Sequence, residues 1–143
     1  MTMSVRELMT ENVATVTPSQ TIQEAASIMS EYNVGSVPVV ENGQLKGIVT
    51  DRDIIIRSTA QGMGSSTPVS HVMSSNLVQG SPSMSVEEAT SLMSQNQIRR
   101  LPIVENNNLV GIVALGDIAT NHTFDHEAEQ ALTNISEPST PQI

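Results

Sequence analysis

LKGIVTDRDI, residues 45–54, is the stretch of sequence that decides the fold. Its first half, residues 45–49, is apolar and carries β-branched residues, a pattern that predicts a β-strand. Gly47 inside that run allows another backbone, or a ligand, to approach closely. Thr50 and Asp53 follow where the strand gives way to a helix, and the unpaired amides at a helix start can hold anions and sugar hydroxyls. The stretch therefore predicts a strand that leads directly into a helix, with a binding position at the junction.

The same pattern recurs 64 residues later as LVGIVALGDI, residues 109–118. Internal repetition of this kind indicates that one supersecondary unit is used twice. Without any gap, the shift by 64 aligns Met9 with Met73, Val13 with Leu77, Pro18 with Pro82, Ala25 with Ala89, Met29 with Met93, Pro38 with Pro102, Val40 with Val104, Glu41 with Glu105, Gly47 with Gly111 and Asp53 with Asp117.

Each repeat predicts the element order β-α-β-β-α after a short helical lead-in. In the first repeat the expected elements are a lead-in at 5–9, a strand at 13–16, a helix that starts at a Thr21–Glu24 capping box, strands at 36–40 and 45–49, and a helix at 51–58. The second repeat matches them with a lead-in at 69–73, a strand at 77–79, a helix that starts at a Ser85–Glu88 capping box, and a final helix at 115–121. Asn42-Gly43 predicts a hairpin turn, and Asn106–Asn108 replaces it in the second repeat.

These elements predict a division of the chain into four segments. They are repeat 1 at 5–60, a small and polar linker at 61–68, repeat 2 at 69–122, and a C-terminal segment at 123–143. In the last segment we expect a short helix around residues 127–132 and a frayed end.

Composition excludes several classes of function. The 143-residue chain contains no cysteine, so neither a disulfide framework nor a thiolate site is possible, which fits a reducing cytoplasm. No N-terminal leader and no apolar run of membrane-spanning length is present, so we predict a cytoplasmic protein. The formal net charge of −9 disfavours both nucleic acids and anionic membranes, and one Tyr and one Phe give no stacking platform for bases.

The duplicated unit, with its Pro-containing strand and its Gly-Ile-Val strand-to-helix junction, resembles a tandem pair of CBS (cystathionine β-synthase) domains, also called a Bateman module. The resemblance covers residues 5–121, nearly the whole chain, and matches stand-alone bacterial CBS-domain proteins. It implies an α/β (α+β) fold in which two βαββα repeats pack with pseudo-two-fold symmetry, sheets facing and helices outside. It also implies that adenosine-type ligands (AMP, ADP, ATP, S-adenosylmethionine or a cyclic dinucleotide) bind in clefts between the repeats, with no cofactor required.

Residue roles follow from the resemblance alone. The Asp at the helix start would accept hydrogen bonds from the ribose hydroxyls, and a Thr three residues earlier would bind ribose or phosphate. Backbone segments would frame the base, and basic residues before the Pro-containing strand would meet the phosphates. The implied nucleotide-binding residues of repeat 1 are Ala14, Thr15, Val34, Val37, Thr50, Arg52 and Asp53. Those of repeat 2 are Leu77, Val78, Ile98, Arg99, Arg100, Leu101 and Asp117.

Repeat 2 departs from the pattern at Ala114, which lacks the hydroxyl of Thr50. A lost hydrogen bond of this kind costs about 1 kcal/mol, so we expect two unequal sites with the Asp53 site the stronger.

Arg99-Arg100 corresponds to the uncharged Gly35-Ser36 in repeat 1. A guanidinium fork suits phosphate, so phosphate recognition should come mainly from repeat 2, with Arg52 as a further contributor.

Simpler interpretations stand beside these. Asp53 and Asp117 could be ordinary acids at helix N-termini, Thr50 a helix cap, and Gly47 and Gly111 packing residues. The arginine pair could be solvated or paired with local acids. His122 and His126 share a helix face with Asp125 and Glu129, a weak candidate for a zinc or nickel site against a polar solvent face.

Three functions are compared. The first is a regulatory sensor in which adenylate binding alters the pairing of protomers, as a homodimer, or an unidentified regulated partner protein. The second is a constitutive dimeric interaction protein with vestigial clefts, which Ala114 and Gly35-Ser36 favour. The third, an enzyme, has the weakest support, because no Walker loop, no nucleophile with a base and no acid/base pair is present.

Overall fold

The computed structural model describes residues 3–75, 77–119 and 131–135, and the chain divides into two compact units. The first-repeat unit comprises Val13–Leu77 and Asn106–Leu109. The second-repeat unit comprises Met1–Asn12, Val78–Glu105 and Val110–Ile143. The compact units therefore differ from the sequence repeats, because each short lead-in belongs to the unit of the other repeat.

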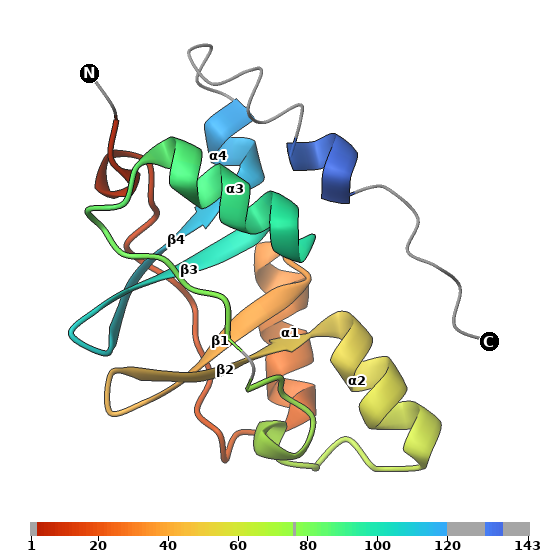
Figure 1. The fold of residues 1–143 in the computed structure, drawn as a ribbon. Helices are drawn as coiled ribbons and strands as arrows, with labels where there is room; N and C mark the ends of the chain where they lie inside the picture. The colour runs from red at the N-terminus through yellow and green to blue at the C-terminus, as the bar shows by residue number, and fades with distance from the viewer. Residues whose placement is uncertain (1–2, 76, 120–130, 136–143) are drawn as a thin grey trace. The chain divides into compact units, whose positions relative to one another are not determined.

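Both units contain the predicted order of helix, hairpin and helix (Figure 1). The first-repeat unit contains α1 (Ile22–Tyr32), β1 (Ser36–Glu41), β2 (Gln44–Thr50), α2 (Asp51–Arg57) and the 3₁₀ turns η2 (Thr59–Gln61) and η3 (Val69–His71). The second-repeat unit contains the 3₁₀ turn η1 (Val5–Glu7), α3 (Val86–Asn96), β3 (Arg100–Glu105), β4 (Asn108–Ala114), whose first two residues count with the other unit, α4 (Leu115–Ala119) and a short helix at 131–135. The fold is thus of the α/β class, as the sequence predicts.

Each hairpin turns through two residues in the left-handed region. In the first-repeat unit these are Asn42 and Gly43, with φ of 54° and 80°, and β1 then pairs with β2 in antiparallel register from Glu41–Gln44 to Ser36–Thr50. Asn106 and Asn107 have φ of 54° and 67° at the other turn. Because Asn and Gly tolerate positive φ better than other residues, both sequences can make the tight turn.

The two glycines that the repeat alignment pairs are sites of close packing. A Cβ added to Gly47 would lie 2.8 Å from Met73 Sδ and 2.8 Å from the Ser74 carbonyl oxygen. The backbones of Ile48 and Ser74 exchange two hydrogen bonds at this point, 3.0 and 2.8 Å long. The absence of a side chain at Gly47 therefore lets the second lead-in lie directly on β2.

Gly111 plays the same part in the second-repeat unit. An added Cβ would lie 2.8 Å from Met9 Sδ and 2.9 Å from the Thr10 carbonyl oxygen, and Thr10 and Ile112 exchange backbone hydrogen bonds of 2.8 and 2.9 Å. The packing interpretation of both glycines is confirmed.

A separate apolar core fills each unit. In the second-repeat unit the buried cluster is Val5, Val86, Ala89, Met93, Leu101, Ile103, Val113, Leu115, Ile118 and Ala131. In the first-repeat unit it is Val16, Ile22, Ala25, Met29, Val37, Val39, Val49, Val69 and Val72. Val5 and Val69, one from each lead-in, are fully buried in the core of the opposite repeat. Burial of these apolar side chains therefore stabilises the exchange of the two lead-ins between the units.

The linker between the repeats is held against the start of α1. The Thr67 and Ser65 carbonyls accept hydrogen bonds from the amides of Ile22 and Gln23, at 2.9 and 3.2 Å. First-turn amides have no partner within their own helix, so these linker carbonyls satisfy them. The sequence predicts only a connection here, and this bonding gives the linker a structural role as well.

The structure differs from the sequence predictions in the first strand and the first helix cap of each repeat, and in the C-terminal helix. The strand expected at 13–16 is reduced to one parallel bridge, Val16 with Val39, and in place of the strand expected at 77–79 there is one parallel bridge at the next residue, Gly80 with Ile103. A turn at Pro18 or Pro82 follows each bridge closely. The Thr21 and Ser85 hydroxyls accept the amides of Glu24 and Glu88 at 3.1 Å, while no described hydrogen bond is donated by the Thr21 or Ser85 amide to the Glu carboxylate. The C-terminal helix expected around 127–132 is seen at 131–135, and residues 127–130 lie outside the described residues.

Candidate functional site

The junction between β2 and α2 is a reciprocal capping box. Thr50 ends the strand in an extended conformation, and its Oγ1 accepts the amide of Asp53 at 3.0 Å. The Thr50 amide in turn donates to Asp53 Oδ2 at 3.0 Å. Both residues therefore stabilise the start of α2, and the interpretation of Thr50 as a helix cap is confirmed.

Asp53 retains acceptor capacity within this arrangement. Its side chain is 14% exposed, and Oδ1 lies 3.7 Å from Arg57 Nε. Arg57 is itself half-exposed, and its Nη1 makes only long contacts, 3.5 and 3.4 Å, to the Val72 and Met73 carbonyls. A carboxylate offers about four lone-pair sites, so one short hydrogen bond and one loose ion pair leave room for sugar hydroxyls.

The β4–α4 junction repeats only half of this geometry. Asp117 Oδ2 accepts the amide of Ala114 at 3.1 Å, which matches the bond between Thr50 and Asp53. Ala114 has no hydroxyl, so the second half of the box cannot form there. In both junctions the Asp carboxylate therefore accepts the amide three residues before it, but only the first junction has a side-chain hydroxyl that caps the helix.

Each junction is also bonded to the residue that precedes its first hairpin strand. The Asp51 amide donates to the Gly35 carbonyl at 3.0 Å, and the Leu115 amide donates to the Arg99 carbonyl at 2.8 Å. These bonds place Gly35 beside the first junction and Arg99 beside the second. The structure thus places the backbone of Arg99 beside that of Leu115, two residues before Asp117 in the chain.

Asp51 is a functional candidate that the sequence analysis missed. A Cβ added to Gly35 would lie 3.3 Å from Asp51 Oδ2, so a carboxylate occupies the surroundings of the position that matches Arg99. The matching residue in the other junction is Leu115, which is buried. The signal was present in the repeat alignment, because Asp51 is a charged residue where its counterpart is apolar. Asp51 therefore places a negative charge beside Gly35, the position that matches Arg99 in repeat 2.

The predicted framing residues divide between the two units. Ala14, Thr15, Val34, Val37 and Leu77 belong to the first-repeat unit with Thr50, Arg52 and Asp53, while Val78, Ile98, Arg99, Arg100 and Leu101 belong to the second-repeat unit with Asp117. Val37 and Leu101 are 1% and 0% exposed as whole residues, so neither their side chains nor their backbones are open to solvent. Arg52, Arg99 and Arg100 are exposed.

His122 and His126, the weak metal candidates, lie outside the described residues. In ranges 3–75, 77–119 and 131–135, no group of three His, Cys, Asp or Glu side chains could hold a metal ion. His71 is exposed. Among these same residues no helix is both long and apolar enough to cross a bilayer.

Comparison with known proteins bears directly on these repeats. The family model described as "CBS domain" matches residues 5–59 and 69–121. The CBS domain-containing protein YhcV of Bacillus subtilis is 64% identical over 133 residues, which cover 93% of this chain and 95% of that protein.

Two solved structures extend the comparison to three dimensions. The structure of Hypoxic Response Protein I with two coordinated zinc ions, a protein of Mycobacterium tuberculosis, has a TM-score of 0.77 at 30% identity and covers 83% of this chain and 98% of that one. The CBS domain pair of protein MJ0100, in complex with 5′-methylthioadenosine and S-adenosyl-L-methionine, has a TM-score of 0.74 at 27% identity, over 84% of this chain and 95% of that one. With its two repeats each matched by the family model, this chain belongs to the CBS domain family as a tandem CBS domain pair.

Proposed function

We propose that this CBS pair is a regulatory module that binds adenosine-type nucleotides, such as AMP, ADP or ATP, at its two strand-to-helix junctions. One observation carries the proposal. A carboxylate is fixed at the same place in both repeats by the amide three residues before it, at 3.0 Å for Asp53 and 3.1 Å for Asp117. A carboxylate held in this way is preorganised to accept hydrogen bonds from the two hydroxyls of a ribose.

The chemistry of a relative supports the adenosine class. The MJ0100 pair was solved with 5′-methylthioadenosine and S-adenosyl-L-methionine, two compounds that share an adenosine and differ in charge. A site that recognises the ribose through a fixed carboxylate would bind adenosine compounds with different groups at the 5′ position.

The two half-sites are proposed to differ in both sugar and phosphate recognition. Thr50 adds a hydroxyl to the first junction that Ala114 cannot supply, so the Asp53 half-site should bind the nucleoside more strongly. Phosphate should be favoured by the exposed Arg99 and Arg100 and disfavoured near the Asp51 carboxylate.

Calorimetric titration of AMP and adenosine tests the assignment. Asp53→Ala removes a charged acceptor and should weaken binding about tenfold or more, since hydrogen bonds to charged groups contribute roughly 1.5–3 kcal/mol. Thr50→Ala should weaken it several-fold and Thr50→Ser should not. Thr21→Ala is the matched control, because it removes the equivalent cap at the start of α1 and touches no proposed site residue. Unchanged affinity in both Asp53→Ala and Thr50→Ala would reject the site.

The phosphate role has its own test. Arg99→Ala combined with Arg100→Ala should reduce the affinity for AMP to that for adenosine, leaving adenosine binding unchanged. If the double variant still prefers AMP to adenosine as strongly as the wild type does, the arginines do not bind phosphate.

The second candidate is a constitutive dimeric interaction protein whose junction carboxylates serve only as helix caps. The completed capping box at Thr50 favours it, because it explains both residues without a ligand. Thermal denaturation separates the two candidates. A nucleotide at about 100 times its dissociation constant stabilises the folded chain by about 2.7 kcal/mol, and a vestigial site gives no shift with AMP, ADP, ATP or S-adenosylmethionine.

As a sensor, the module would act by unequal affinity of the nucleotide for two states of an assembly. We propose a homodimer as that assembly, and an unidentified regulated protein as its further partner.

A further inference from the structure

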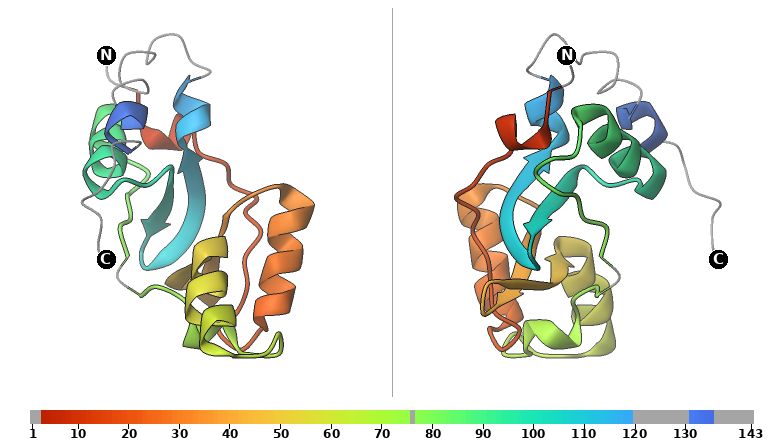
Figure 2. Two further views of the ribbon diagram at one scale, coloured as in Figure 1. Left: turned by 90° about the vertical axis from the view of Figure 1, so that its right-hand side faces the viewer. Right: turned by 60° about the vertical axis from the view of Figure 1, so that its left-hand side comes forward.

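The second lead-in passes beside α2 of the first-repeat unit (Figures 1 and 2). Val69 and Val72 of this lead-in are fully buried in the core of the unit. Ser74, directly after the lead-in, exchanges two backbone hydrogen bonds with Ile48 of β2, the strand that ends at Thr50. The lead-in is therefore a fixed part of the surroundings of the first junction.

Arg57, the last residue of α2, lies between this lead-in and the Asp53 carboxylate. Its Nε is 3.7 Å from Asp53 Oδ1, and its Nη1 is 3.5 and 3.4 Å from the carbonyl oxygens of Val72 and Met73. Asp53 and Arg57 are four residues apart, the spacing at which side chains meet on a helix surface. One guanidinium thus contacts the proposed ribose-binding carboxylate on one side and the lead-in backbone on the other.

The other charged groups of this junction make different contacts. Asp51 Oδ1 accepts the Arg52 amide at 2.8 Å, and its Oδ2 lies 3.3 Å from the position of a Cβ added to Gly35. Arg52 is exposed on the first turn of α2. Within the part of the chain that the structure describes, only Arg57 forms an ion pair with Asp53. Arg57 is therefore the cation that can orient this carboxylate.

The two oxygens of the Asp53 carboxylate are contacted from different elements. Oδ2 accepts the Thr50 amide at the end of β2, and Oδ1 faces Arg57 at the end of α2. Since a guanidinium is rigid and planar, its contacts with the two lead-in carbonyls limit the direction from which it meets Oδ1. Arg57 is half-exposed and its contacts are long, so its contribution is to the orientation of Asp53 more than to the stability of the fold.

We propose that Arg57 is a positioning residue of the first half-site: supported by the lead-in backbone, it fixes the orientation in which the Asp53 carboxylate meets the ribose hydroxyls. The inference rests on the proposed function of Asp53, and Arg57 acts through that carboxylate without contact to the nucleoside. The repeat alignment pairs Arg57 with the uncharged Asn121, which lies outside the described residues. The positioning role is therefore assigned to the first half-site alone.

Titration calorimetry with adenosine and 2′-deoxyadenosine tests the positioning role. It is made in an Asp117→Ala background, which removes the carboxylate of the second half-site, and neither nucleoside has a phosphate for the other arginines to bind. With Arg57 present, adenosine should bind about tenfold more tightly, because its 2′ hydroxyl donates to a charged acceptor. Arg57→Gln should reduce this preference about two- to fivefold, the range of an exposed ion pair. A purely structural loss would weaken both nucleosides equally, so an unchanged preference overturns the proposal.

Arg6→Gln is the matched control for the loss of an arginine. The Arg6 side chain is 56% exposed, against 54% for Arg57, and it pairs with Glu105 at 3.0 Å within the second-repeat unit. This variant should keep the preference for adenosine, and circular dichroism melting should show that both arginine variants fold. An equal loss of preference in Arg6→Gln and Arg57→Gln would contradict a specific role of Arg57.

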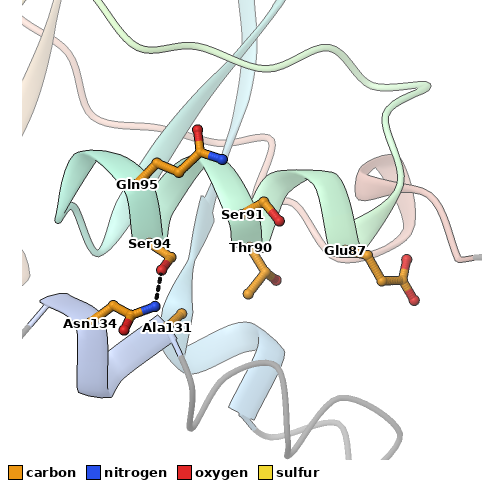
Figure 3. A pocket seen from close by; sticks show the side chains of 7 residues that line it. All are labelled: Glu87, Thr90, Ser91, Ser94, Gln95, Ala131 and Asn134. Atoms are coloured by element: carbon orange, nitrogen blue, oxygen red, sulfur yellow. Dashed lines mark hydrogen bonds between the residues drawn. The ribbon is translucent and has the colours of Figure 1, made fainter.

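A second control removes a side-chain contact between two elements of the other unit. The short helix at 131–135 lies against α3, where Asn134 Nδ2 donates to Ser94 Oγ at 2.5 Å (Figure 3). Ala131 of this helix is buried in the core of the second-repeat unit, so the helix has an apolar contact as well. Asn134→Ala should therefore fold and keep the wild-type preference, and a loss as large as that in Arg57→Gln would count against the proposal.

A double-mutant cycle shows whether Arg57 acts through Asp53. Asp53→Asn keeps an acceptor for the Thr50 amide and removes the charge. In that variant a further Arg57→Gln should change the adenosine affinity by less than about 1.5-fold, and an equal loss with and without Asp53→Asn would refute the positioning role alone. Equal adenosine affinity of the background protein and its Asp53→Asn variant would instead reject the proposed function at this junction, and the inference with it.

Amide hydrogen exchange tests the link to the lead-in. Coupling between two sites is reciprocal, so a nucleoside bound at Asp53 must also stabilise the lead-in if Arg57 joins them. In the same background, saturating adenosine should slow exchange of the Ser74 amide, bonded to β2 at 2.8 Å, at least threefold more than exchange of its counterpart, the Thr10 amide, bonded to β4 at 2.8 Å. In Arg57→Gln the two amides should be slowed equally. A Ser74 amide that keeps its extra protection in Arg57→Gln would show that Arg57 does not join the site to the lead-in.

Discussion

At the scale of single residues, Gly47 and Gly111 show what a missing side chain contributes. Each allows a lead-in from the other repeat to approach β2 or β4 closely enough for paired backbone hydrogen bonds. Adding a methyl group there would force a backbone carbonyl and a methionine sulfur to move, and backbone is costly to move in a packed interior.

We therefore expect Gly47→Ala and Gly111→Ala each to lower the free energy of unfolding by about 1–3 kcal/mol. Gly116→Ala is the control, because an added Cβ there meets nothing within 4 Å and the residue lies in α4. That change should leave stability the same or raise it by up to about 1 kcal/mol. Urea denaturation measures all three, and a neutral Gly47→Ala would show that the lead-in can shift without cost.

A second prediction at this scale concerns the incomplete cap at Ala114. Ala114→Thr supplies the hydroxyl that Thr50 provides in the other repeat and should stabilise the chain by about 1 kcal/mol. Ala114→Val adds the same bulk without the hydroxyl and controls for packing. Chemical denaturation in which the Thr variant is no more stable than the Val variant would show that the cap geometry is not transferable between the junctions.

At the scale of elements, the hairpins depend on two consecutive residues with positive φ. The turn in the first-repeat unit uses Gly43 at φ of 80°, and the other turn uses Asn107 at 67°. Left-handed backbone costs most residues about 1–2 kcal/mol, and Gly avoids this cost while Asn reduces it. The turn chemistry therefore fixes the register of the pairs beside the turn, Glu41–Gln44 and Val40–Leu45, and the register shifts between Val39 and Val40.

Gly43→Ala should accordingly destabilise the chain by about 1–2 kcal/mol, and Gly43→Asn by clearly less. An added Cβ also comes 3.1 Å from Asn108 Oδ1, which increases the cost. Gly64→Ala is the matched control, since Gly64 has no positive φ and open space around it. Thermal unfolding with equal losses for Gly43→Ala and Gly64→Ala would contradict the left-handed requirement.

At the scale of the whole molecule, the lead-ins link each repeat to the other along the chain. Val5 begins repeat 1 in sequence and is buried in the core of the second-repeat unit, while Val69 begins repeat 2 and is buried in the core of the first-repeat unit. Neither repeat can complete its core from its own contiguous sequence. Folding of one repeat should therefore depend on a segment from the other.

Hydrogen exchange can detect this crossing. Val5→Ala should lower the free energy of unfolding by about 2 kcal/mol and reduce amide protection mainly in residues 86–105 and 110–118 of the second-repeat unit. Val69→Ala should reduce it mainly in residues 22–57 of the first-repeat unit. If each substitution instead reduces amide protection mainly in its own sequence repeat, the lead-ins are not exchanged between the two cores.

Local patterns made much of the fold predictable. The Asn-Gly turn, the Thr and Ser caps, and the glycine-containing strand each depend on residues close together in the chain, and the structure contains all of them. In place of the strands expected at 13–16 and 77–79 the structure has one bridge at Val16 and one at Gly80, since the residues of these segments alternate poorly and a Pro-containing turn follows each bridge closely. The identity of the junction carboxylates was also readable, because the repeat aligned Asp53 with Asp117.

The sequence by itself determined a doubled β-α-β-β-α chain and the two positions where carboxylates meet helix starts, because turns, caps and periodicity are short-range properties. Only the tertiary structure decided that the lead-ins are exchanged, that Asp51 lies beside Gly35, and that residues 131–135 lie against α3. The physical reason is that the repeats are alike. Val5 and Val69 carry the same local pattern and suit either core, so the choice between them rests on contacts between residues far apart in the chain.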